Sequence, residues 1–131
     1  MALQLGTAVR TGMGDELVTA ADTGEMKIFS GAVPANCAAA DPSGTLVTMT
    51  LPSPALSNAS GTVTKSGTWS FTASATGTAA SFRLYTSGAV CFAQGNVTAT
   101  GGGGTMEIDN TSIANGQTGT VTAVTLTIGG A

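Results

Sequence analysis

The chain contains short runs in which apolar and polar residues alternate, each ended by a glycine-containing turn, and the clearest pair occupies residues 80–97. Phe82 and Leu84 share one side of a two-residue period, which indicates a half-buried strand. Ser87-Gly88 then allows a tight reversal, because glycine accepts positive φ at little cost. This stretch predicts a β-hairpin. It holds two of only four Phe and the single Tyr, so we expect it at the centre of a β core.

Similar runs continue along the chain, separated by turn residues such as Asp41-Pro42-Ser43-Gly44 and Asn115-Gly116. Residues 61–73 repeat the hairpin pattern, with Trp69 and Phe71 expected in the core. A change of apolar parity in the last run predicts a bulge there. Outside the central hairpin, the predicted strands are residues 26–30, 45–51, 62–64, 69–72, 105–109 and 118–128.

About eight short strands at near-regular spacing are typical of a β-sandwich. A chain of 131 residues has room for one domain with one core. We therefore predict a single all-β domain over residues 1–131, a jelly-roll-like β-sandwich of about eight strands with one short N-terminal helix. An immunoglobulin-like sandwich is the alternative.

Residues 5–21 predict that helix, because Leu5, Val9, Met13 and Leu17 are spaced four residues apart. Glycines at positions 12 and 14 weaken it by about 1 kcal/mol each relative to alanine, so it needs a surface to pack on. The segment 1–22 either lies on its own domain, which we favour, or is an arm that docks on a neighbouring subunit.

Charged residues make up 8% of the chain, against roughly 25% in typical soluble domains, and the net charge is −3. Low charge favours a protein that is packed against others. The four basic residues are scattered, which argues against nucleic-acid binding. Apolar runs are too short for a membrane span, and the first ten residues do not resemble a signal peptide. We therefore expect synthesis in a cytoplasm and no membrane association.

Cys37 and Cys91 are the only cysteines and do not have metal-site spacing. A disulfide requires that the fold bring them together. We expect free thiols, because the presumed compartment is reducing.

The absence of histidine excludes Ser-His-Asp and Cys-His centres. Glu107 and Asp109 share a strand face and could hold Ca²⁺ or act as a carboxylate pair, but a solvated face is the simpler interpretation. Four glycines at 101–104 lack the Lys-Ser/Thr of a phosphate loop and predict a flexible loop. We therefore expect no catalytic residue, metal or cofactor, and a protein that is not an enzyme.

Contact residues are the remaining candidates for function. Arg83 and Tyr85 lie on the side of the central strand opposite Phe82 and Leu84, and both residue types are enriched at interface hot spots. We select five candidate interface residues: Arg83, Tyr85, Leu5, Val9 and Met13.

Several segments together resemble a family of small virion structural proteins of tailed bacteriophages, of the capsid decoration or cement type. The segments are Met26-Lys27-Ile28-Phe29-Ser30-Gly31, Pro34-Ala35, Gly44-Thr45-Leu46, Gly77-Thr78-Ala79, Phe82-Arg83-Leu84, Asn110-Thr111-Ser112-Ile113 with Gly116, and Val121-Thr122 to Thr127. The chain departs from the family pattern at residues 101–105, where glycines replace a usual acidic residue.

The resemblance implies a jelly-roll-like protein on the capsid surface that bridges subunits of the major capsid protein, as a dimer or trimer and without catalytic residues. The alternative is a phage tail or spike component, a receptor- or carbohydrate-binding β module with Trp69, Tyr85 and Glu107 as possible ligand contacts.

Overall fold

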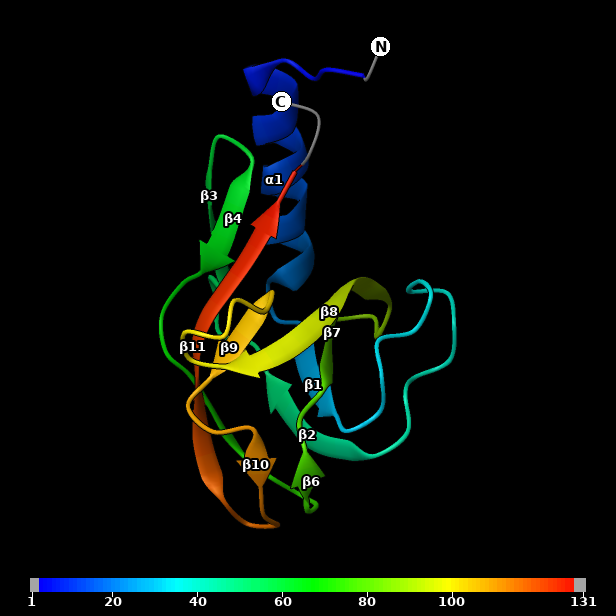
Figure 1. Cartoon of the computed structure of the whole chain (residues 1–131). Helices are drawn as coiled ribbons and strands as arrows, with labels where there is room; N and C mark the ends of the chain where they lie inside the picture. Colours follow the sequence, from blue (N-terminus) through cyan, green and yellow to red (C-terminus); the bar gives the residue numbers. More distant parts are fainter. Residues whose placement is uncertain (1–2, 129–131) are drawn as a thin grey trace.

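The computed structural model describes residues 3–128 and has one helix among short strands (Figure 1). The prediction of an all-β, sandwich-like fold with an N-terminal helix is confirmed. The described residues form eleven strands rather than about eight, because β3, β6 and β10 are too short for a clear alternation. The elements are α1 (Thr7–Ala21), β1 (Glu25–Phe29), β2 (Thr45–Thr50), β3 (Leu56–Ala59), β4 (Thr62–Lys65), β5 (Trp69–Thr72), β6 (Gly77–Thr78), β7 (Ser81–Tyr85), β8 (Cys91–Ala99), β9 (Met106–Ile108), β10 (Ser112–Ile113) and β11 (Thr118–Thr127).

The main sheet has the strand order β2-β1-β7-β8-β9-β11-β4-β3, and β5 also pairs with β11. β8 and β9 are parallel, whereas the neighbouring pairs β7–β8 and β9–β11 are antiparallel. The sheet curls until the end of β5 meets β2, where the Ser74 amide donates to the Leu46 carbonyl at 2.8 Å. β6 and β10 form a small separate sheet at the end of the molecule opposite α1 (Figure 1).

The central hairpin is confirmed, because β7 pairs with both β1 and β8 in the middle of the sheet. Its turn is closed by the Thr86 amide, which donates to the Val90 carbonyl at 2.9 Å. Apolar side chains from nearly every strand form one buried cluster inside the curl. Its largest fully buried members are Trp69, Phe82, Met26, Ile28, Leu46, Leu56, Leu84, Met106 and Ile108.

The predicted hairpin over residues 61–73 is wrong. β4 and β5 do not pair with each other; they follow one another along β11, β5 beside Thr118–Val121 and β4 beside residues 125–127. β4 instead forms a hairpin with β3, and Ser60 and Gly61 at its turn both have positive φ. A ten-residue β11 has room for two short partners in tandem. The predicted bulge in β11 is confirmed between Val121 and Ala123.

α1 lies on its own domain, against β3 and β4, as favoured above. The face that packs is not the predicted Leu5–Val9–Met13–Leu17 stripe. It centres on Gly14, where an added Cβ would overlap the Asn58 side chain. Asn58 Nδ2 donates to the Thr11 carbonyl at 2.8 Å and to Asp15 Oδ1 at 2.9 Å. The helix approaches the hairpin closely because glycine leaves room for this amide, and of the predicted stripe only Leu17 packs against the core.

Candidate functional site

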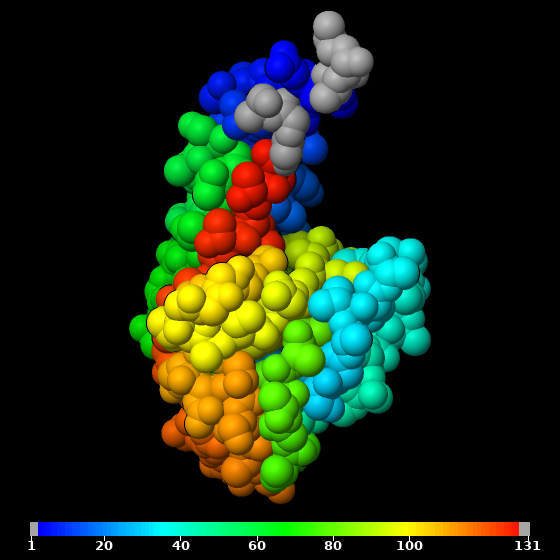
Figure 2. Space-filling view, in the orientation of Figure 1, coloured from blue at the N-terminus to red at the C-terminus, as the bar shows by residue number. Residues whose placement is uncertain are grey.

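The predicted outward pair, Arg83 and Tyr85, lies on the face of β7 opposite Phe82 and Leu84, but the two residues are only 2% and 6% exposed. The connection between β1 and β2 covers them, and we call its residues 31–43 the pinned loop. The loop protrudes beside the sheet in Figure 2. The prediction of an exposed Arg–Tyr surface is therefore wrong, because a strand pattern does not reveal that a distant loop folds over the outer face.

Arg83 fixes the pinned loop from beneath. Its Nη1 donates to the Ala39 carbonyl and to Asp41 Oδ1, both at 3.0 Å, and its Nη2 donates to the Asn36 carbonyl at 3.1 Å. Its Nε donates to Gln94 Oε1 at 3.1 Å, so one guanidinium joins β8 to three points of the loop. A planar group with five donors suits this role, whereas a lysine has a single donor centre.

The neck and flank of the pinned loop are also closed. The Ser30 amide donates to the Gly44 carbonyl at 2.9 Å, and the Gly31 amide donates to the Ser43 carbonyl at 3.0 Å. On the flank, Gln94 Nε2 donates to the Pro34 carbonyl at 2.7 Å. These bonds hold the loop in one conformation against β7 and β8.

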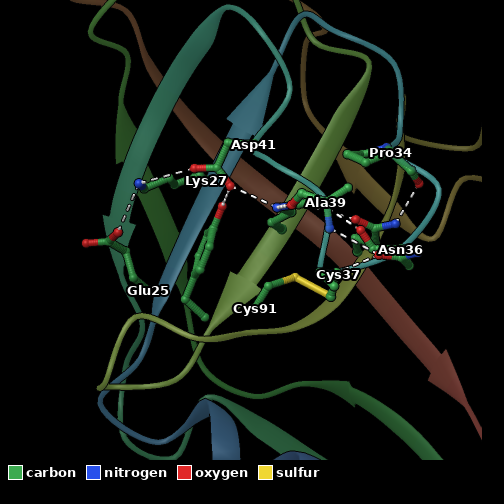
Figure 3. A network of polar contacts seen from close by, with 12 residues as sticks. Glu25, Lys27, Pro34, Asn36, Cys37, Ala39, Asp41 and Cys91 are labelled. Atoms are coloured by element: carbon green, nitrogen blue, oxygen red, sulfur yellow. Dashed lines mark hydrogen bonds and ion pairs between the residues drawn. A yellow bond between two sulfur atoms is a disulfide. The ribbon is translucent and has the colours of Figure 1, made fainter.

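Cys37 of the loop and Cys91 of β8 form a disulfide, with their Cα atoms 5.4 Å apart (Figure 3). The prediction of free thiols is therefore wrong. It was based on the presumed compartment, whereas the Cα separation follows from the seating of the loop by Arg83 and Gln94. A separation of 54 residues in sequence gives no sign of this proximity.

Tyr85, Asp41 and Lys27 form the polar end of the cluster. The Tyr85 hydroxyl donates to Asp41 Oδ1, and Lys27 Nζ lies 4.0 Å from Asp41 Oδ2 and 5.2 Å from the centre of the Tyr85 ring. The hydrogen bond from Tyr85, with help from Arg83 and Lys27 and against the effect of burial, lowers the pKa of Asp41. Burial, followed by the hydrogen bond to Asp41, raises the pKa of Tyr85.

We expect this cluster to make stability depend on pH at the acid end. Because its folded pKa is lowered from 3.8, the Asp41 carboxylate stabilises the fold above that pH, and the contribution is lost as the pH falls through the folded value. Asp41→Asn and Tyr85→Phe should therefore both reduce the difference in unfolding free energy between about pH 5 and about pH 2. Urea unfolding at a series of pH values measures this, and an unchanged difference in both variants would contradict it.

Of the predicted helix residues, Val9 and Met13 point to solvent, with 54% and 45% exposure, and Leu5 is half-buried. Leu3, just before the helix, is 77% exposed. Together Leu3, Val9 and Met13 make up what we call the helix patch. The same helix carries Arg10, Asp15 and Glu16.

The acidic pair and the predicted sugar-stacking residues have structural contacts. Glu107 accepts hydrogen bonds from the amides of Gly101 and Gly103, and Asp109 accepts one from the Thr120 amide. The glycine loop is thus tied to a carboxylate of its own chain. Trp69 is fully buried, with its indole Nε1 donating to the Ser66 carbonyl at 3.2 Å. Neither Trp69 nor Tyr85 is available to stack on a sugar.

Within residues 3–128 there is no group of three His, Cys, Asp or Glu side chains placed to hold a metal ion. No helix in that range is long and apolar enough to cross a membrane. A shallow pocket of about 140 Å³, lined by residues that include Thr23, Glu25, Thr50 and Thr86, lies beside the β7–β8 turn. It contains one carboxylate and several hydroxyl groups.

Comparison with known proteins found no matching family model, no similar curated protein and no similar solved structure.

Proposed function

We propose that this chain is a structural protein of a bacteriophage particle, a capsid decoration or cement protein that stabilises the head by bridging subunits of the major capsid protein. It would act on the outer surface of the head after synthesis in the host cytoplasm. The observation that carries the proposal is the helix patch, because a helix already packed on its own domain still presents Leu3, Val9 and Met13 to solvent. The sequence resemblance to small virion proteins and the 8% charged content support the same function.

The helix patch suits adhesion to a protein surface. Burial of an exposed valine or methionine contributes about 1.5 kcal/mol or more, and each 1.4 kcal/mol corresponds to tenfold in affinity. Repeated over many copies, such contacts would resist expansion of a shell. The role needs no catalytic group and no cofactor.

The first test is the composition of virions of the phage that encodes the chain. Quantitative mass spectrometry should find at least one copy per capsomer, and a particle reconstruction should place its density on the head. A handful of copies would contradict the proposal, and density on the tail would favour a tail or spike component instead.

The second test concerns the helix patch. Val9→Asp combined with Met13→Asp should lower the affinity for heads that lack the protein by at least about tenfold, because each change removes apolar contact and adds a charge. Titration of purified heads with labelled protein measures this. Thr72→Asp, which adds the same charge at an exposed residue of β5, is the control and should bind normally. Equal binding by all variants would show that the helix patch is not the contact.

A further inference from the structure

The exposed large apolar residues of the described chain fall into two groups. Leu3, Val9 and Met13 form the helix patch, whereas Val33 and Val90, 40% and 63% exposed, flank the disulfide. Val33 belongs to the pinned loop, and Val90 immediately precedes Cys91 at the start of β8. The disulfide therefore holds two separate apolar segments side by side.

Two ties define how these segments run. The Pro34 carbonyl is bound by Gln94, and Cys37 is bonded to Cys91, so the loop runs antiparallel to the first residues of β8. Val33 lies beyond one tie and Val90 beyond the other, and about 10 Å of extended chain separates the ties. Ala35 and Ala38 are exposed in the same part of the loop. We call Val33, Ala35, Ala38 and Val90 the loop strip.

The loop strip has two properties that distinguish it from the helix patch. Residues 31–40 contain no charged side chain, and the nearest charges, Asp41 and Arg83, are paired with each other at 3.0 Å. The loop is also held by the guanidinium of Arg83 and by the disulfide, so its ordering on contact costs little entropy.

We propose that the loop strip is a two-fold contact between two copies of this chain. A two-fold axis through the middle of the strip places Val33 of one copy against Val90 of the other, and the reverse pair forms by symmetry. Two copies that each carry a net charge of −3 associate most easily where neither presents a charge. The helix patch is a poorer self-contact, because a two-fold axis there would bring Asp15 and Glu16 of both copies together. This contact does not require the capsid, so it stands apart from the proposed function.

The test is sedimentation velocity of the oxidised full chain at concentrations from about 1 µM to about 1 mM. We expect a monomer–dimer equilibrium. Val33→Asp and Val90→Asp should each weaken dimerisation by at least about tenfold, because the symmetry introduces each substitution twice. Thr72→Asp should leave it unchanged. Circular dichroism checks that every variant is folded, which is expected because the substituted side chains are exposed.

Two results would overturn the assignment: a monomer at every concentration, or a dimer that is weakened by Val9→Asp and not by the loop variants. A second variant tests the role of the disulfide, because Cys37→Ser with Cys91→Ser frees the loop from β8 and should also weaken the dimer. Undiminished dimerisation of that folded variant would show that the pinned strip is not the contact.

Discussion

Replacement of Arg83 by methionine should lower the free energy of unfolding by about 3 kcal/mol or more, because removal of one partner from a buried ion pair costs about 3–5 kcal/mol. The guanidinium is 2% exposed and serves Asp41, Gln94 and two loop carbonyls. Methionine would fill much of the space and satisfy none of these acceptors. Urea unfolding of the two proteins measures the difference.

Lys65→Met is the matched control, since Lys65 donates only to the nearby Gly67 carbonyl in a partly exposed position. It should change the free energy of unfolding by no more than about 0.5 kcal/mol. Arg83→Lys should also destabilise the protein, because one ammonium cannot reach all the acceptors of the planar fork. If Arg83→Met were as mild as the Lys65 variant, Arg83 would not be what anchors the pinned loop.

Removal of the disulfide should have an effect of similar size. A cross-link between residues 54 apart restricts the unfolded chain, and the chain-entropy model gives about 4 kcal/mol for a loop of this length. We expect the Cys37→Ser, Cys91→Ser double variant to lose about that much unfolding free energy in urea.

A reducing agent provides the internal control for this prediction. Added dithiothreitol should destabilise the wild-type protein by about the same amount and leave the double variant unaffected. A loss below about 1 kcal/mol in both experiments would mean that the noncovalent contacts of the loop hold it without help from the cross-link.

Individual strands were predictable where packing follows the local pattern. Phe82 and Leu84 are buried because alternate side chains of a strand face the same side. The tandem arrangement of β4 and β5 was not predictable in this way. Lys65-Ser66-Gly67-Thr68 is a good turn sequence, but the partner of both strands is β11, more than fifty residues away.

The helix illustrates the same limit. Its position was predicted, but the spacing of Leu5, Val9 and Met13 indicated the wrong packing face. Asn58 binds the backbone at Thr11, and the small Gly14 admits it there. A hydrogen bond and a gap thus decided the orientation over the apolar stripe.

The amino-acid sequence alone determined that this protein is built from short strands around one apolar core with a helix at its start, and that no histidine chemistry is possible, because alternation, turn residues and composition are local properties. Only the tertiary structure decided that Arg83 is buried, that Cys37 meets Cys91, and that Val33 and Val90 share a surface. Each of these depends on where one loop settles, and that position follows from hydrogen bonds between residues more than forty apart, for which a single sequence carries no local signal.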